Sequence, residues 1–250
     1  MHYIIVTGTS RGLGEAIAMK LLKEGNHLFC VSRSKNEALI AKAKEQGVAL
    51  DYFEQDLNDT AGAELMFEEI FSKMDLERAN SVTLFNNAGV LNPIAPIEKY
   101  STDDLIRNIN VNLIAPMLAS SLFIQHVEGL NCERRIINVS SGAGLKAYYG
   151  WSAYCASKAA VNMFTACVAM EQAKRDNPVT ILAFAPGVID TEMQGEIRKS
   201  SEEDFAPLKR FIAYHENGDL MPPDFVAKKA ITLMTASFEN GSFVDVYELD

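Results

Sequence analysis

The chain has 250 residues, of which 48% are hydrophobic and 22% are charged, and 33 acidic against 23 basic residues give a formal net charge of −10. This balance is typical of a globular protein with a sizeable apolar core, and it excludes disordered and fibrous classes. The negative charge would repel a polyanion, so nucleic acid is not an expected partner.

The four cysteines, at positions 30, 132, 155 and 167, lie far apart and form no C-x-x-C pair. This usage favours a reduced, cytoplasmic protein with neither disulfides nor a metal site. The chain enters a strand-like run almost at once, and no apolar run reaches about 18 residues. We therefore expect a protein that is neither secreted nor membrane-spanning.

Strand-like apolar runs alternate with segments of helical periodicity. In order, we expect a strand at 3–7, a helix at 12–24, a strand at 27–31, a helix at 35–46, a strand at 49–54 and a helix at 60–73. A strand at 82–85, a helix at about 102–127, a strand at 135–139, a helix at about 152–175 and a strand at 179–184 follow. Several strands are continuous β-branched and aromatic runs, which indicates that helices cover both sheet faces. The pattern predicts one α/β domain over 1–250, a Rossmann fold whose doubly wound, mostly parallel sheet has about seven strands.

The segment from about 192 to 221 interrupts this alternation. It is charged, and apolar side chains are scattered through it: Phe205, Phe211, Ile212, Tyr214 and Met221. Long excursions of this kind usually form lids over a binding site. We expect a substrate lid here, the alternative being a helical insertion on the surface.

A glycine-rich turn joins the first expected strand to the first helix. Its spacing is G-x-x-x-G-x-G, and residues without a Cβ atom let the chain turn sharply and let a pyrophosphate approach the backbone N–H groups. In a doubly wound sheet, the first turn of this type is where dinucleotides bind. We expect cofactor contacts from Gly8, Ser10, Arg11, Gly12, Leu13 and Gly14.

The end of the second strand distinguishes the two nicotinamide cofactors. An acidic residue there would bind the ribose 2′-hydroxyl of NAD(H), but this chain has Ser32 and Arg33. The guanidinium groups of Arg33 and Arg11 suit a 2′-phosphate. The sequence therefore favours NADP(H) as the cofactor.

Tyr154 and Lys158 lie four residues apart in a helical segment and so share one helix face. Ser141 ends the preceding strand, and the loop between could fold both side chains over one pocket. A neighbouring ammonium and the positive charge of a nicotinamide would lower the pKa of the phenol toward neutrality. Ser141 would hold a substrate carbonyl, and Asn112 could hold a water that connects Lys158 with solvent. The expected catalytic residues are Asn112, Ser141, Tyr154 and Lys158.

Together these motifs resemble the short-chain dehydrogenase/reductase family over essentially the whole chain. Further matches are Asp56-Leu57, Asn86-Asn87-Ala88-Gly89 and the run from Pro186 to Thr191. The resemblance implies that Asp56, beside Leu57, meets the adenine and that Asn87, Ala88 and Gly89 pass the adenosine ribose. It also implies that Ile189 and Thr191, after Pro186 and Gly187, hold the nicotinamide carboxamide. Family relatives pair the helices matching 112–127 and 152–175, which implies a homodimer.

A closer similarity to the sepiapterin reductases and bacterial benzil reductases of this family rests on Gly150-Trp151, on 190–194 and on 241–247. In the sepiapterin enzymes an aspartate matching Asp245 anchors the pterin, which implies a substrate contact here. The loop before Tyr154 should bring Leu145, Tyr148 and Trp151 to the site, and the lid should add Met193. These side chains predict an apolar, aromatic pocket for a flat, bulky carbonyl compound.

We therefore expect an NADPH-dependent carbonyl reductase that transfers a hydride to a bulky aromatic or pterin-like ketone or 1,2-diketone. Two alternatives stay open. One is an NAD(P)-dependent alcohol dehydrogenase that oxidises a small hydroxy compound. The other is a dinucleotide-sensing protein without catalysis, against which the presence of both Tyr154 and Lys158 argues.

Overall fold

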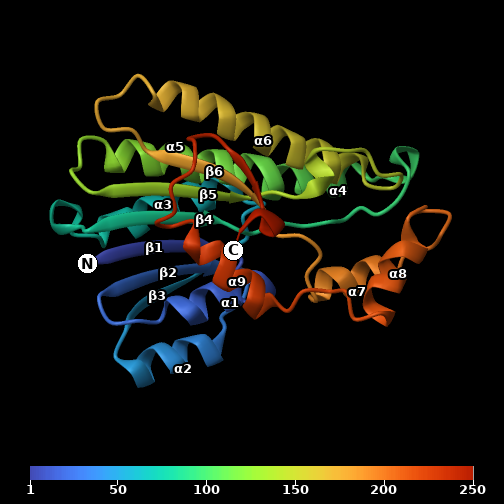
Figure 1. Cartoon of the computed structure of the whole chain (residues 1–250), viewed down its shortest axis with the longest axis horizontal. Coiled ribbons are helices and arrows are strands. Elements are labelled where there is room, and N and C mark those ends of the chain that lie inside the picture. Colours follow the sequence, from blue (N-terminus) through green and yellow to red (C-terminus); the bar gives the residue numbers. More distant parts are fainter. Residues whose placement is uncertain (250) are drawn as a thin grey trace.

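A seven-stranded parallel sheet forms the centre of the computed structural model, which describes residues 1–249 (Figure 1). The strand order is β3-β2-β1-β4-β5-β6-β7. The strands are β1 (His2–Thr7), β2 (Asn26–Ser32), β3 (Ala49–Glu54), β4 (Ser81–Asn86), β5 (Glu133–Val139), β6 (Thr180–Ala185) and β7 (Phe243–Asp245). The order reverses between β1 and β4, and ligands of open α/β sheets bind at the carboxyl ends of the strands at such a point.

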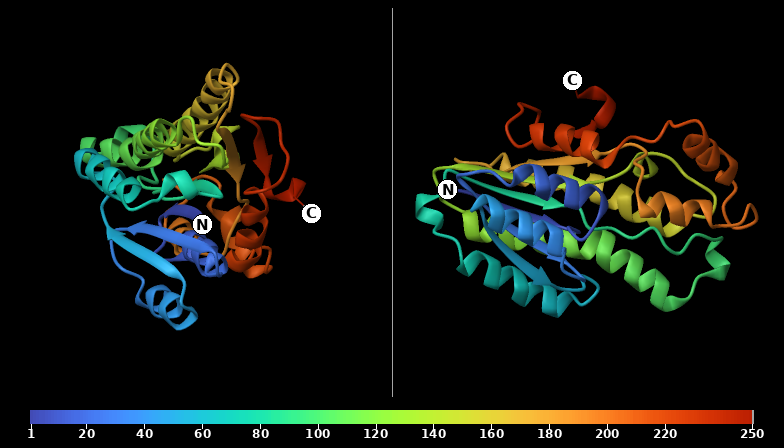
Figure 2. Two further views of the ribbon diagram at one scale, coloured as in Figure 1. Left: turned by 90° about the vertical axis from the view of Figure 1, so that its left-hand side faces the viewer. Right: turned by 90° about the horizontal axis from the view of Figure 1, so that it is seen from below.

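Helices cover both faces of the sheet (Figures 1 and 2). One face packs against α1 (Gly12–Leu21), α2 (Glu37–Gln46) and α9 (Pro223–Thr232), and the other packs against α3 (Thr60–Ser72), α5 (Ala115–Val127) and α6 (Ser152–Gln172). Successive side chains of a strand point to opposite faces. Ile4 therefore lies in one apolar core and Ile5 in the other, both with no exposed surface. This confirms the expected α/β Rossmann-like fold with helices on both faces.

The remaining helices are shorter than most of those that cover the sheet. They are α4 (Thr102–Ile109), α7 (Glu192–Arg198), α8 (Leu208–Glu216) and the short turns η1 (Leu76–Arg78), η2 (Ile97–Lys99), η4 (Gly142–Gly144) and η5 (Val246–Glu248). α7 and α8 extend past the carboxyl ends of the strands, at the right of Figure 1. No helix within residues 1–249 is long and apolar enough to cross a membrane.

The expected continuous helix at 102–127 is wrong in its middle. Between α4 and α5 the chain forms a π-helical turn, η3 (Asn110–Ile114), in which the N–H of Ala115 donates to the carbonyl of Asn110. The side chain of Asn112 bonds both the N–H and the carbonyl of Val90, at 2.8 and 2.7 Å. These bonds hold the turn toward the loop after β4. The helical periodicity of the sequence cannot predict such bonds between distant residues.

The two ends of the segment 192–221 lie close together, outside the seven strands. Ile189 and Met221 form an isolated parallel bridge, in which the N–H of Met221 donates to the carbonyl of Val188 at 3.0 Å. Farther out, Lys99 of η2 pairs with Glu203 and Asp204 at 2.8 Å each. The segment is therefore fixed at two places, by the bridge at its ends and by the ion pairs of Lys99 near its middle.

Candidate active site

A cavity of about 780 Å³ lies at the carboxyl ends of the strands, beside β1 and β4. Its size is in the range of small-molecule sites. The glycine-rich turn closes one wall: a Cβ atom on Gly8 (φ +76°) would lie 2.9 Å from the Cα of Ala88, and one on Gly14 would lie 2.2 Å from the carbonyl oxygen of Gly8. Of the six residues expected in this turn, Gly8, Ser10, Arg11, Gly12 and Leu13 line the cavity. Gly14 does not, because it packs beneath the turn.

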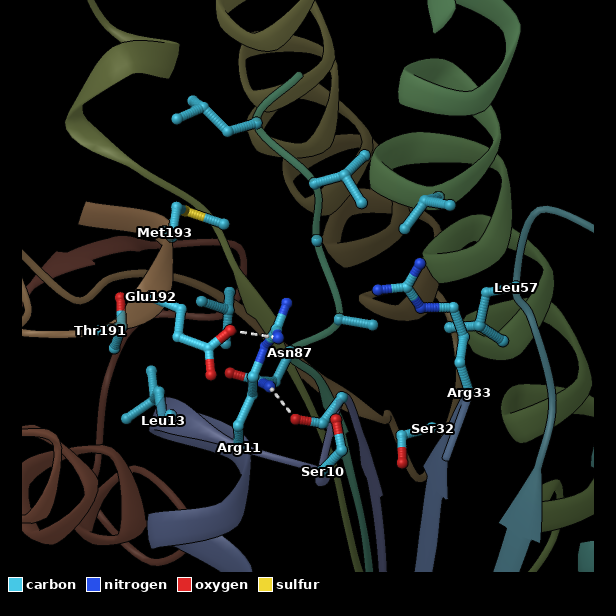
Figure 3. A pocket seen from close by; sticks show the side chains of 18 of the residues that line it. Ser10, Arg11, Leu13, Ser32, Arg33, Leu57, Asn87, Thr191, Glu192 and Met193 are labelled. Carbon is cyan, nitrogen blue, oxygen red and sulfur yellow. Dashed lines mark hydrogen bonds and ion pairs between the residues drawn. The ribbon is translucent and has the colours of Figure 1, made fainter. Parts of the chain in front are cut away.

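Arg11 and Arg33 both line the cavity, in different settings. Figure 3 shows Arg11 paired with Glu192, the first residue of α7, and Arg33 on the opposite side of the view from Glu192 and Met193. Arg33 is exposed at the end of β2, and none of the ion pairs found within residues 1–249 involves it. The geometry therefore leaves the guanidinium of Arg33 available to an anionic ligand.

The residues expected around the adenosine also line the cavity: Asp56, Leu57, Asn87, Ala88 and Gly89. Asn87 is held against β1, because its Nδ2 donates to the carbonyl of Thr7 at 2.8 Å. Asp56 accepts a hydrogen bond from the N–H of Asn58 at 3.0 Å and pairs with Arg107 at 3.2 Å. Arg107, on α4, is a lining residue that sequence reasoning missed, since only the fold brings it to this wall.

Three of the four residues expected at the nicotinamide end line the cavity, namely Pro186, Ile189 and Thr191. Gly187 does not. Its φ is +71°, and a Cβ atom there would lie 2.3 Å from the Cε of Met221. Gly187 therefore allows the close approach of Met221 and makes no cavity contact itself.

Tyr154 and Lys158 lie one helical turn apart on α6 and are 7% and 4% exposed. Both line the cavity. The Nζ of Lys158 donates to the carbonyl of Val139 at 2.8 Å and lies 5.8 Å from the centre of the Tyr154 ring. Ser140 lines the cavity, whereas the hydroxyl of Ser141 accepts from the N–H of Ala143 at 3.1 Å and caps η4.

Burial controls the acid–base properties of this pair. Burial raises the pKa of Tyr154 to about 12, against an opposing interaction with the Ser141 hydroxyl. Burial also lowers the pKa of Lys158 to about 8. The expected lowering of the phenol pKa requires the positive charge of a nicotinamide beside the ammonium group, so it stays a prediction for the protein with bound cofactor. The low pKa of Lys158 suits a group that passes a proton near neutral pH.

Asn112 is buried, but its side chain has little capacity left for a water. Besides its two bonds to Val90, its Nδ2 lies 3.1 Å from the Oδ1 of Asn108 and 3.4 Å from the Oγ of Ser157. Asn112 is also absent from the residues that line the cavity. The expected water at its side chain therefore stays a prediction.

The aromatic side chains expected in the pocket mostly pack against one another. Trp151 is 4% exposed and stacks on Phe205 with ring centres 4.5 Å apart, while Tyr148 lies 5.2 Å from Trp151. Leu145 is 66% exposed. None of these four side chains lines the cavity, although Met193 does. The expected aromatic wall is instead a core that supports α7 and α8.

Asp245 also lies away from the cavity lining. Its carboxylate accepts from the N–H of Tyr247 at 3.2 Å, and Glu248 completes the capping box of η5. The lining adds polar groups that were not expected, including Glu192, Glu196 and Asn92. The cavity is therefore less apolar than the sequence predicted.

Comparison with known proteins agrees with this architecture. The chain belongs to the short-chain dehydrogenase family, whose model matches residues 2–202. It is 45% identical to a benzil reductase ((S)-benzoin forming) of Bacillus cereus over 249 residues, which cover 99% of this chain and 100% of that one. A benzil reductase of Bacillus subtilis (strain 168) is 39% identical, with 99% of each chain covered. A sepiapterin reductase of Rattus norvegicus is 27% identical, with 98% of this chain and 96% of that one covered. The chain is thus an oxidoreductase of this family.

Solved structures have the same fold. The KRED1-Pglu enzyme matches with a TM-score of 0.83 and 33% identity, covering 98% of this chain and all of that one. A candidate NAD(P)-dependent gluconate 5-dehydrogenase from Beutenbergia cavernae, solved with NADP at low occupancy, matches with a TM-score of 0.82 and 28% identity, covering 98% and 94%. The family uses NAD(P)(H), and the tight glycine turn and the cavity fit such a cofactor.

Proposed function

We propose that this protein is an NADPH-dependent carbonyl reductase acting on bulky aromatic 1,2-diketones such as benzil. The observation that carries the proposal is one cavity lined by Tyr154, Lys158, the glycine turn and Arg33, whose guanidinium forms no ion pair with residues 1–249. The full-length similarity to the benzil reductase of Bacillus cereus supports the substrate class. NADP(H) is favoured because Arg33 stands where an NAD-binding acid would stand.

The chain's own residues account for binding and proton transfer. The glycine turn would hold the pyrophosphate and Arg33 the 2′-phosphate, and bound NADPH supplies the hydride. Tyr154 donates its phenolic proton to the carbonyl oxygen of the substrate as the carbonyl carbon is reduced, which leaves a hydroxyl group. Lys158 then stabilises the phenolate and returns a proton to it, which its pKa of about 8 permits. Ser141, on the strand end beside Tyr154, would orient the carbonyl.

A diketone suits the site better than a pterin. A pterin would need the carboxylate of Asp245 to face the substrate, and that carboxylate caps η5 instead. A diketone needs no such anchor. A sepiapterin-like compound remains the second candidate, supported by the similarity to the sepiapterin reductases.

The test is an NADPH oxidation screen of the purified protein against benzil, other aromatic 1,2-diketones, sepiapterin and simple aldehydes. We expect turnover of the diketones and a higher kcat/KM with NADPH than with NADH. Oxidation of short hydroxy acids without reduction of any diketone would instead support the alcohol dehydrogenase. Cofactor binding without turnover of any carbonyl or alcohol would support the sensing protein.

We further infer a homodimer formed through α5 and α6. These helices and η3 carry apolar side chains that the monomer leaves exposed, among them Ile114, Met117, Met163 and Met170 at 38%, 37%, 66% and 73%. Exposed apolar patches of this kind mark interaction surfaces. The cytoplasm is the proposed compartment, since all four cysteines are free thiols.

A further inference from the structure

Asn108, on α4, is a fully buried side chain that the reaction proposed above does not use. Burying an amide costs free energy unless its groups are hydrogen-bonded, and here both are. Its Nδ2 donates to the carbonyl of Asn92 at 2.8 Å and lies 3.5 Å from that of Leu91. Its Oδ1 accepts from the Nδ2 of Asn112 at 3.1 Å and from the Oγ of Ser157 at 3.3 Å. One amide therefore joins α4, η3, the loop after β4 and α6.

The joined segments carry two parts of the site. Leu91 and Asn92 line the cavity, and Leu91 packs in the same apolar cluster as Tyr154. Ser157 stands between Tyr154 and Lys158 on α6, and its Oγ also lies 3.0 Å from the carbonyl of Tyr154. Asn108 thus links a cavity wall to the helical turn that carries the proton donor.

We propose that Asn108 is a positioning residue that sets the wall formed by Leu91 and Asn92 relative to the hydroxyl of Tyr154. This inference rests on the proposed carbonyl reductase function. The wall limits how a bulky ketone can turn while its oxygen faces Tyr154, and so limits which face of the carbonyl is reduced. Because an error of about 1 Å in such a site can lower the rate about 100-fold, Asn108 controls both turnover and the stereochemistry of the product.

The test is Asn108→Asp, which keeps the shape of the side chain and its acceptor oxygen but loses the NH2 donor. An ionised carboxylate cannot donate to the carbonyls of Leu91 and Asn92, whereas the bonds from Asn112 and Ser157 can persist, so the variant is assayed at a pH at which this carboxyl is ionised. We expect kcat for benzil to fall about 10- to 100-fold, KM for NADPH to stay within about twofold, and the enantiomeric excess of the hydroxyketone to fall.

Asn138→Asp is the matched control. Asn138 is equally buried and its side chain also joins separate elements, through Asn86 and Thr165, but that side chain makes no hydrogen bond to Leu91, Asn92 or Ser157. It should lower the stability, measured by urea unfolding, by a similar amount without changing the enantiomeric excess. Ser157→Ala removes the bond between α6 and Asn108, the 3.4 Å contact with the Nδ2 of Asn112 and a bond within α6. It should produce a smaller loss of kcat and enantiomeric excess even if Asn108→Asp does not fold.

The outcomes separate the two proposals. Suppose that the wild-type enzyme turns over benzil, and that kcat and enantiomeric excess are unchanged in Ser157→Ala and in any folded Asn108→Asp. This result overturns the positioning role alone. An equal loss of enantiomeric excess in Asn138→Asp overturns it too, because the effect would then follow general destabilisation. A wild-type enzyme that reduces no carbonyl compound overturns the proposed function, and this inference with it.

Discussion

Replacing Lys158 by Met should make the protein more stable and inactive. Burial lowers the pKa of Lys158 from 10.5 to about 8, which at about 1.4 kcal/mol per pH unit means that its charge costs the folded state about 3 kcal/mol. Methionine has a similar length and no charge. The carbonyl of Val139 loses its bond from Nζ, which costs about 1 kcal/mol. We therefore expect a net gain of about 2 kcal/mol at pH 7 without cofactor.

The dependence on pH tests the cause. Between about pH 8 and 10.5 the unfolded chain holds a proton at Lys158 that the folded chain has released, so the wild type gains stability with rising pH. The advantage of Lys158→Met should be largest below pH 8 and disappear toward pH 10.5. Urea unfolding followed by circular dichroism at several pH values measures this difference, with Lys174→Met at an exposed lysine as the control. A variant that is less stable at pH 7, with a difference that does not change with pH, would refute the reasoning.

Three further results are expected. Tyr154→Phe should lower kcat about 10²- to 10⁴-fold while NADPH binding, measured by fluorescence, stays nearly intact, because only the proton donor is lost; reduction within tenfold of the wild type would contradict this role. Arg33→Ala should raise KM for NADPH at least about tenfold and leave KM for NADH almost unchanged, because a charge-assisted hydrogen bond contributes about 1.5–3 kcal/mol; equal effects on both cofactors would mean that Arg33 is only a solvated charge. Light scattering should give the mass of a dimer across the micromolar range, and a monomer mass would exclude the interface of α5 and α6.

Features that depend on neighbours along the chain could be predicted from the sequence. Ile4 and Ile5 belong to a run that is buried on both sides, and such runs predict a strand between two helical layers. The four-residue spacing of Tyr154 and Lys158 predicts one helix face, and both side chains line the cavity. The glycine turn could be predicted from the G-x-x-x-G-x-G spacing, because the sharp backbone turn itself requires residues without a Cβ atom.

Features that depend on contacts between distant segments could not be predicted. The π-helical turn depends on bonds from Asn112 to Val90, 22 residues away. Asp245 is an exception, because the bond that orients its carboxylate is local, from the N–H of Tyr247 two residues on, and the match to a substrate-binding position concealed it. The sequence predicts Trp151 in the pocket, but Trp151 stacks on Phe205, which lies far along the chain in the segment 192–221. The short β7 has too few residues to give a periodic signal.

The bridge between Ile189 and Met221 makes the segment 192–221 a separable module. Its two ends are held together by this isolated bridge, outside the seven strands, so closing the loop costs little more chain entropy for a long insert than for a short one. None of its residues belongs to the seven strands, although Glu192 pairs with Arg11 of the glycine turn. Recombination at these two points would therefore exchange the segment without altering a strand, provided that the partner of Arg11 is kept. The same two points are where a chimera between a diketone reductase and a pterin reductase should be joined.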